Sequence, residues 1–285
     1  MTPTIYMNTN LNTVAEPNVA TDPLTERVRT TWTSGDFGRI ARGYERGAGE
    51  FVARLGLEFG ERVLDVACGT GNLAVPAAHT GASVTGIDIA PNLVDQLRVR
   101  AAEEGVSVTC DVGDAERLPY EDGAFETVMT MFGAMFAARP ERAASELLRV
   151  ARRGGRIAMA NWTPTGFVGE MLKTTARYAQ PPAGIPSPLL WGSETHVQAR
   201  LAAGCTSLTF ARRLMTFEYP FGPVDVVNLF RNWYGPTVRA FATLSSADQI
   251  GLRRDLEELW AEHNRATDGT IRVQSEYLEV IAVVS

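Results

Sequence analysis

The stretch Val63-Leu-Asp-Val-Ala-Cys-Gly-Thr-Gly71 decides the fold of this chain of 285 residues. Its first half is an apolar run, which is typical of a parallel strand buried on both faces. Its second half is a turn rich in glycine, and residues 72–79 are expected to begin a helix. Glycines at such a turn let a ligand approach the backbone closely, and the start of the helix offers free N–H groups. The stretch therefore predicts a strand, a ligand-binding turn and a helix.

Strands and helices continue to alternate after this turn. Further strands are expected at residues 83–89, 106–112, 125–131 and 156–161, and helices at 91–104 and 140–151. Residues 153–155 predict a tight turn before the strand at 156–161. This alternation favours a doubly wound α/β fold with a parallel sheet.

The segments on either side of this core are predicted to be mainly helical. Residues 1–24 are expected to form a flexible tail, and 25–285 one domain that includes N-terminal helices (25–60) and a helical cap insertion (about 222–268). Two short helices are expected before residue 55, and the regular alternation stops past Trp162. Later elements are predicted as helices at 168–178, 193–203 and over most of 223–267, and as strands at 207–217 and 271–284.

Composition and charge are those of an ordinary globular protein, with 45% hydrophobic and 21% charged residues. The formal net charge of −6 provides no general attraction for nucleic acid or an anionic membrane surface. No apolar stretch approaches the roughly 20 residues of a membrane span. The cysteines Cys68, Cys110 and Cys205 lack the paired spacing of a disulfide framework or a zinc site. We therefore expect a cytoplasmic protein with no nucleic-acid partner and no metal.

The glycine turn does not identify its ligand by itself. Read as Gly69-x-Gly71-x-x-Ala74, it also satisfies the loose dinucleotide fingerprint, and similar turns occur in α/β proteins that bind no nucleotide. Asp88 ends the second strand, where a carboxylate can accept hydrogen bonds from both hydroxyl groups of a ribose. Asp114 and Ala115 follow the third strand, where they could meet the amine and a ring nitrogen of adenine.

Asp65 discriminates between the possible ligands, because it ends the first strand directly before the glycines. A carboxylate at this point would repel a pyrophosphate but would suit the cationic ammonium group of a methionine moiety. The residues therefore favour S-adenosylmethionine over a dinucleotide.

Taken in order, these motifs resemble those of class I S-adenosylmethionine-dependent methyltransferases. The resemblance runs through residues 63–71, 86–91, 113–128 and 147–157. Within this family, the chain is similar to the group that includes ubiquinone and menaquinone biosynthesis enzymes. It implies a Rossmann-like sheet of seven strands, in which the last strand is antiparallel and lies between the fifth and the sixth. The resemblance is strong through about Trp162 and thins over the cap.

The resemblance also implies S-adenosylmethionine as the methyl donor and S-adenosylhomocysteine as its product. Asp65 and the glycines would hold the methionine end, Asp88 the ribose, and Asp114 the adenine, with Phe132 near the sulfonium. The full set of predicted donor-binding residues is Asp65, Ala67, Gly69, Gly71, Asp88, Ile89, Asp114, Ala115, Met131 and Phe132. The family often carries a tyrosine of the N-terminal helices over the donor, a place that Phe37 or Tyr44 could take.

Several acceptor classes do not fit the sequence. Methylation of amino groups on nucleic-acid bases would suggest an Asn/Asp-Pro-Pro-Tyr/Phe motif where this chain has Met131-Phe-Gly-Ala134. A catechol-type magnesium site needs acidic ligands near the ends of the fourth and fifth strands, and neither end supplies one. Apolar and aromatic residues border the expected site instead, and we assign to an acceptor pocket Trp32, Phe37, Tyr44, Met135, Phe136, Trp162, Trp191, Trp233 and Tyr234. Phe167, Tyr178 and Phe230 belong to the same group. They predict a small apolar or aromatic acceptor, although any one of them could be a core residue.

No catalytic base stands out. His196 and Tyr44 are weak candidates, whereas His79 is expected to be structural and His263 to be exposed. Two alternative functions stay open at this point. One is a nicotinamide-dependent oxidoreductase on the same fold, which would lack an evident Tyr-x-x-x-Lys pair. The other is a non-catalytic protein that binds S-adenosylmethionine.

Overall fold

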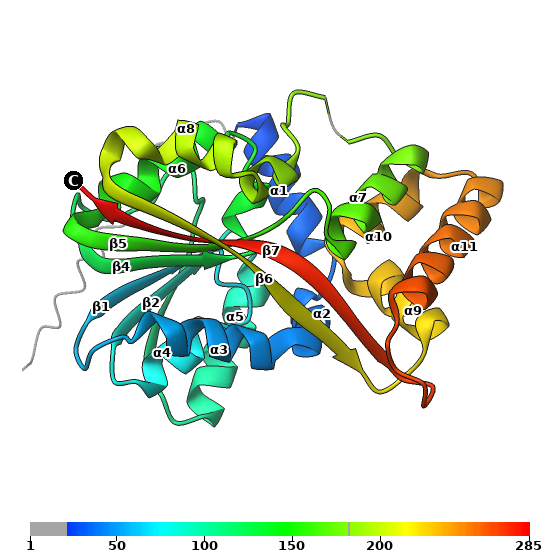
Figure 1. Cartoon of the computed structure of the whole chain (residues 1–285), viewed down its shortest axis with the longest axis horizontal. Helices are drawn as coiled ribbons and strands as arrows, with labels where there is room; N and C mark the ends of the chain where they lie inside the picture. The colour runs from blue at the N-terminus through cyan, green and yellow to red at the C-terminus, as the bar shows by residue number, and fades with distance from the viewer. Residues whose placement is uncertain (1–21, 182) are drawn as a thin grey trace, which may run out of the picture.

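The computed structural model describes residues 22–181 and 183–285, so most of the predicted tail lies outside the described residues. A seven-stranded sheet with the order β3-β2-β1-β4-β5-β7-β6 forms the centre of the molecule (Figure 1). Its strands are β1 (Arg62–Val66), β2 (Ser83–Asp88), β3 (Val108–Val112), β4 (Phe125–Met131), β5 (Ala151–Trp162), β6 (Cys205–Tyr219) and β7 (Ile271–Val284). Strands β1 to β5 are parallel, and β7 runs antiparallel to both β5 and β6. The predicted position and direction of the last strand are confirmed.

Helices cover both faces of the sheet, with α6 and α8 above it and α3 and α4 below it in Figure 1. The α-helices of the sheet domain are α3 (Glu45–Leu55), α4 (Ala74–His79), α5 (Pro91–Glu103), α6 (Pro140–Val150) and α8 (Glu194–Leu201). In α6, Ala143, Leu147 and Val150 recur at helical spacing and are buried, so one stripe of this helix packs on the sheet. Pro91 occupies the first turn of α5, where its missing N–H would have no partner.

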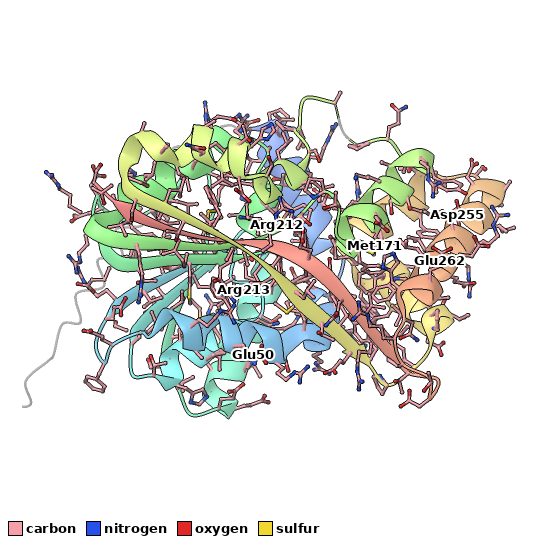
Figure 2. All side chains as sticks on the ribbon, in the orientation of Figure 1. Glu50, Met171, Arg212, Arg213, Asp255 and Glu262 are labelled. Atoms are coloured by element: carbon pink, nitrogen blue, oxygen red, sulfur yellow. The ribbon has the colours of Figure 1, made fainter. Side chains whose placement is uncertain are left out.

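A second group of helices lies past the carboxyl ends of the parallel strands and beside the far half of the β6–β7 ribbon (Figure 1). These are α1 (Pro23–Thr33), α2 (Phe37–Ala41), α7 (Phe167–Tyr178), α9 (Pro223–Trp233), α10 (Gly235–Thr243) and α11 (Ser246–His263). The segment predicted as a cap contains α9, α10 and α11, and α7 packs against α11. On α7, Met171 points into this group, whereas Glu262 of α11 lies on its outer surface (Figure 2).

Two local predictions need correction. The segment before residue 55 forms α1, α2, the 3-10 turn η1 (Arg42–Tyr44) and α3, rather than two short helices. Strand β5 begins at Ala151, and residues 152–155 are part of it rather than a separate turn. The pairing passes from Phe125 with Ala151 directly to Thr127 with Arg156, so the glycine-rich residues form a bulge within the strand.

The long edge strand β6 is held to β7 by charged side chains on both faces. The consecutive residues Arg212 and Arg213 point to opposite sides of the ribbon (Figure 2). Arg212 pairs with Glu276 at 2.9 Å, and Arg213 pairs with Glu279 at 2.7 Å. Among the described residues, no helix combines the length and the apolar character needed to cross a membrane.

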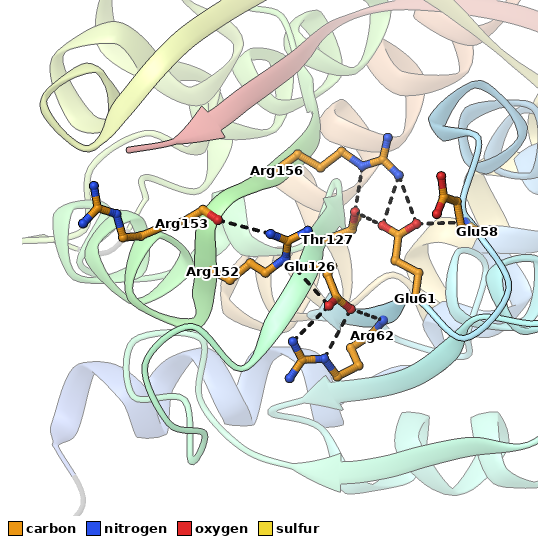
Figure 3. Close-up of polar contacts among 8 residues, drawn as sticks. All are labelled: Glu58, Glu61, Arg62, Glu126, Thr127, Arg152, Arg153 and Arg156. Carbon is orange, nitrogen blue, oxygen red and sulfur yellow. Dashed lines mark hydrogen bonds and ion pairs between the residues drawn. The ribbon is translucent and has the colours of Figure 1, made fainter.

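A polar network lies near the amino-terminal ends of β1, β4 and β5, on the edge of the sheet opposite the carboxyl ends of the parallel strands (Figure 3). Arg156 donates from Nε to Oγ1 of Thr127 at 2.7 Å and from Nη1 to the carbonyl of Leu55 at 2.6 Å. Its Nη2 lies 3.1 Å from Oε1 of Glu61, a carboxylate that is only 12% exposed. One guanidinium therefore connects the end of α3 to three strands.

Replacing Arg156 with alanine is expected to lower the free energy of unfolding by about 2–3 kcal/mol, because the nearly buried Glu61 then loses its cation. Chemical denaturation measures this change. Arg152→Ala is the matched control in the same network, since that side chain is 49% exposed and lies 3.7 Å from Glu126. The control should stay within about 0.5 kcal/mol of the wild type. Equal effects of the two variants would contradict this account.

Candidate functional site

A cavity of about 860 Å³, the first cavity, lies at the carboxyl ends of β1, β2 and β4. The loops after the first four strands line most of it, and Val28 and Trp32 of α1 and Phe37 of α2 lie over it. The predicted donor-binding residues that line it are Asp65, Ala67, Gly69, Asp88, Ile89, Asp114, Ala115, Met131 and Phe132.

Gly71 is the one predicted donor-binding residue that does not line the first cavity. Its φ of +88° lies in the left-handed region, and a Cβ at this position would come within 2.4 Å of Cδ1 of Leu97. Gly71 therefore shapes the turn and lets α5 pack closely beneath it.

Asp65 presents an unusual carboxylate to the first cavity. The residue is 1% exposed, and its Oδ2 has no hydrogen-bond partner among the described residues. Burial raises the pKa of Asp65 well above its ordinary value, and the charge of Asp88 acts in the same direction, against a hydrogen bond from the backbone N–H of Ala74. An unpartnered buried carboxylate oxygen is costly, so the fold retains here an acceptor that a bound cation or donor group would satisfy.

Asp88 holds the glycine turn in place. It accepts a hydrogen bond from the backbone N–H of Gly69 at 2.8 Å and another from that of Ala90 at 2.9 Å. Burial raises the pKa of Asp88, while these backbone hydrogen bonds oppose the increase. The carboxylate therefore connects the loop after β1 to the end of β2, a role that the sequence did not reveal.

The N-terminal helix reaches the opposite end of the first cavity. Thr25 of α1 donates a hydrogen bond to Oδ2 of Asp114 at 3.1 Å. Nearby, Arg139 forms ion pairs with Asp22, at the start of α1, and with Glu116 at 2.9 Å. These contacts join α1 to the loops after β3 and β4. Sequence reasoning missed them, because no spacing rule connects residues so far apart in the chain.

Backbone strain is concentrated in the wall of the first cavity. Ala67, with φ of 57°, and Phe132, with φ of 55°, are the non-glycine residues in the left-handed region within the described ranges 22–181 and 183–285. Between their loops, a Cβ on Gly133 would lie 2.6 Å from Cβ of Ala67. Such strain persists where packing enforces it, and it is common at functional sites. Here it brings the loops after β1 and β4 into contact.

A second cavity, of about 320 Å³, adjoins the first. It is lined by Trp32, Phe37, Ile40, Tyr44, Phe132, Phe136, Trp162, Val168, Met171, Phe217, Phe230 and Tyr234. Trp32, Phe37, Tyr44, Phe132 and Phe136 line both cavities. The Phe132 ring stacks on that of Trp162, with the centroids 3.5 Å apart.

Of the residues assigned to an acceptor pocket, Trp32, Phe37, Tyr44, Phe136, Trp162 and Tyr234 line at least one cavity. Met135, Trp191 and Trp233 line neither cavity. Met135 and Trp191 are core residues, and Trp233 packs under the guanidinium of Arg39 at 4.2 Å. Consecutive residues of a helical turn point in different directions, so Met135 and Trp233 turn away where their neighbours Phe136 and Tyr234 do not.

Two further aromatic residues that the sequence predicts near the site also line neither cavity, namely Phe167 and Tyr178. Phe167 packs against Trp260, with ring centroids 4.5 Å apart. Tyr178 donates a hydrogen bond to Asp255 at 2.7 Å. Both residues therefore support the packing of α7 on α11.

The candidate bases differ in position. His196 is exposed on α8, with Nδ1 3.1 Å from Oγ of Ser193, and it lines neither cavity. Tyr44 lines both cavities, but burial raises its pKa well above the ordinary value, so its phenol is neutral. His79 lies near Glu104 at 3.0 Å, away from the cavities. His263 is half-buried against Glu170 at 3.0 Å rather than exposed.

Comparison with known proteins shows consistent similarities. Residues 64–159 match the sequence profile of a methyltransferase domain. An uncharacterized protein of Mycobacterium tuberculosis is 37% identical over 254 residues, which cover 88% of this chain and 91% of that protein. A demethylmenaquinone methyltransferase of Deinococcus radiodurans is 32% identical over 149 residues, or 51% of this chain and 61% of that enzyme.

A solved structure has a similar fold. It is a phosphoethanolamine N-methyltransferase of Haemonchus contortus in complex with phosphomonomethylethanolamine and S-adenosylhomocysteine. The TM-score is 0.53 at 18% identity, covering 84% of this chain and 52% of that chain.

Proposed function

This chain belongs to the class I S-adenosylmethionine-dependent methyltransferases, and we propose that it binds the methyl donor in the first cavity and a small apolar or aromatic acceptor in the second. The observation that carries this proposal is the carboxylate of Asp65, which is buried in the wall of the first cavity and whose Oδ2 has no partner in the described part of the chain. A methionine moiety carries an ammonium group that could donate a hydrogen bond to this carboxylate and neutralise its charge. A pyrophosphate at the same place would be repelled.

The other carboxylates of the first cavity support the same orientation of the donor. Asp88 has its two oxygens held by Gly69 and Ala90 and retains lone pairs for the ribose hydroxyl groups. Asp114 and the backbone of Ala115, which line the end of the cavity that Thr25 of α1 contacts, would bind the adenine. In this arrangement the sulfonium lies near Met131 and Phe132, beside the second cavity.

Methyl transfer from a sulfonium is an in-line displacement with a good leaving group, so positioning and exclusion of water provide much of the catalysis. The cavity walls supply both. The strained loops at Ala67 and Phe132 fix the floor, and α1 and α2 cover the donor. Tyr44 and Phe132 line both cavities and would stand where the methyl group passes from donor to acceptor.

Calorimetry with S-adenosylmethionine, S-adenosylhomocysteine and NAD tests the donor assignment. We expect the first two to bind with one site per chain and NAD to show no binding at the same concentrations. Tight binding of NAD, or no binding of either sulfur compound, would contradict the proposal. Incubation of a metabolite extract with a donor labelled on the methyl group then tests transfer. A protein that binds the donor but labels no small molecule would favour the non-catalytic alternative.

A further inference from the structure

Aromatic residues form most of the lining of the second cavity, and no ionic side chain is among them. Among the described residues that line it there is no Asp, Glu, His, Lys or Arg. The lining residues that carry a polar side-chain group are Trp32, Tyr44, Trp162 and Tyr234. Burial raises the pKa of Tyr44 and of Tyr234, so neither phenol is available as a base at neutral pH. The acceptor therefore meets no proton acceptor and no fixed cation in this wall.

This composition disfavours several kinds of nucleophile. An alcohol or phenol has to lose a proton during methylation, and the wall offers no group to take it. A carboxylate or thiolate would have to leave water without a cation to replace its hydration, which is costly in an apolar site. An uncharged amine has neither difficulty, because it enters as a neutral molecule with its lone pair free.

The aromatic rings suit an amine for a second reason. The faces of Trp, Tyr and Phe rings attract cations, and the attraction is stronger where water is excluded. Rings approach one another around the second cavity from several elements. Trp32 lies 5.1 Å from Phe136, Tyr44 lies 5.5 Å from Phe217, and Phe230 lies 5.4 Å from Tyr234, measured between ring centroids.

We propose that the acceptor is an amine on an apolar or aromatic skeleton and that the second cavity stabilises the positive charge which the amine gains. The inference rests on the proposed function. In the step, the nitrogen lone pair forms the N–CH₃ bond while the S–CH₃ bond breaks and its electron pair stays on sulfur. The positive charge passes from sulfur to nitrogen and remains among the rings. Any proton already on the nitrogen leaves with the product as an ammonium ion, so the protein needs no base.

Three probes with the same branched carbon skeleton test this inference on the full chain saturated with S-adenosylhomocysteine. They are choline, its uncharged isostere 3,3-dimethylbutan-1-ol and the anion 3,3-dimethylbutanoate. Titration followed by saturation-transfer NMR should show choline binding at least about ten-fold more tightly than the alcohol, and the anion binding most weakly. Equal binding of choline and the alcohol, tightest binding of the anion, or no binding of choline would overturn the inference.

A pair of matched variants locates the effect. Phe230 lines the second cavity, whereas Phe241 is a buried phenylalanine of α10 outside both cavities, beneath the guanidinium of Arg231. Phe230→Leu should lower the ratio of choline to alcohol affinity by about three-fold, and Phe241→Leu should leave it unchanged. An equal change in both variants would contradict this location. Unchanged affinity for S-adenosylhomocysteine shows that each variant is folded, whereas failure of the wild type to bind it would overturn the proposed function instead.

Discussion

Replacing Asp65 with asparagine is expected to reduce the affinity for S-adenosylhomocysteine by about 100-fold or more, although the two side chains have nearly the same size. The carboxylate is 1% exposed and its Oδ2 has no partner within residues 22–181 and 183–285, so its charge would meet the proposed donor in a site that water hardly screens. Loss of one partner from a buried charge pair costs about 2–5 kcal/mol of binding free energy. Calorimetry on both proteins measures the change.

The free protein should respond in the opposite direction. Burial raises the pKa of Asp65 in the folded state, so the folded protein binds this proton more tightly than the unfolded chain does. The stability that the group contributes is present below its unfolded pKa of about 3.9 and is lost as the pH rises through the folded value. At pH 8, Asp65→Asn should therefore unfold with a free energy no lower than that of the wild type.

The same reasoning gives a pH dependence for donor binding. An ammonium group beside Asp65 favours the ionised carboxylate, so donor affinity should increase with pH until the pKa of Asp65 in the free protein is passed. The increase should be smaller in Asp65→Asn. Asp111→Asn is a suitable control, because this carboxylate of β3 accepts from the Tyr120 hydroxyl at 2.8 Å and lies outside the first cavity. A difference of less than three-fold between Asp65→Asn and the wild type would remove Asp65 from the donor site.

Replacing Asp88 with alanine should affect both binding and stability. Loss of charge-assisted hydrogen bonds to the ribose is expected to cost about 1–3 kcal/mol of donor affinity. The backbone N–H groups of Gly69 and Ala90 also lose their acceptor, which should lower the free energy of unfolding by about 2–4 kcal/mol. The glycine turn is then held less firmly. The total loss of donor affinity should therefore reach the upper end of the range given for binding, about 3 kcal/mol.

Asp88→Asn separates the role in stability from the role in binding. The amide oxygen of asparagine still accepts a hydrogen bond, whereas the negative charge is lost. We expect this variant to recover at least half of the stability lost in Asp88→Ala while its donor affinity stays well below that of the wild type. Thermal unfolding and calorimetry provide the two measurements. A folded Asp88→Ala protein with unchanged affinity for S-adenosylhomocysteine would contradict the assignment of Asp88 to the ribose.

The position of α1 over the first cavity depends on contacts that connect distant parts of the chain. Thr25 donates to Asp114, and Arg139 pairs with both Asp22 and Glu116. The other end of α1 packs on the cap helices, since a Cβ on Gly235 would lie 2.2 Å from the carbonyl oxygen of Thr31. Both ends of the helix are therefore held across the first cavity.

The sequence by itself determined the family, the order of the strands and most of the wall of the first cavity. The cavity wall follows from short-range patterns, namely an apolar strand, a glycine turn and an acidic residue at a strand end, whereas the order of the strands is what the resemblance to the family implies. Parallel strands end at the same edge of a sheet, so Asp65, Asp88 and Asp114 had to come together once the strands were recognised. The bulge at residues 152–155 was not predictable, since glycines favour a turn and a bulge alike.

Only the tertiary structure decided what each side chain faces. It placed Gly71 against Leu97, and it placed His196 and Trp191 outside the lining of both cavities. It also formed the second cavity from rings of α1, β5, β6 and α9, which the sequence could only place near one another. The physical reason is that helix geometry and packing between distant segments set the direction of a side chain. Spacing along the chain sets only which strand end or helix carries it.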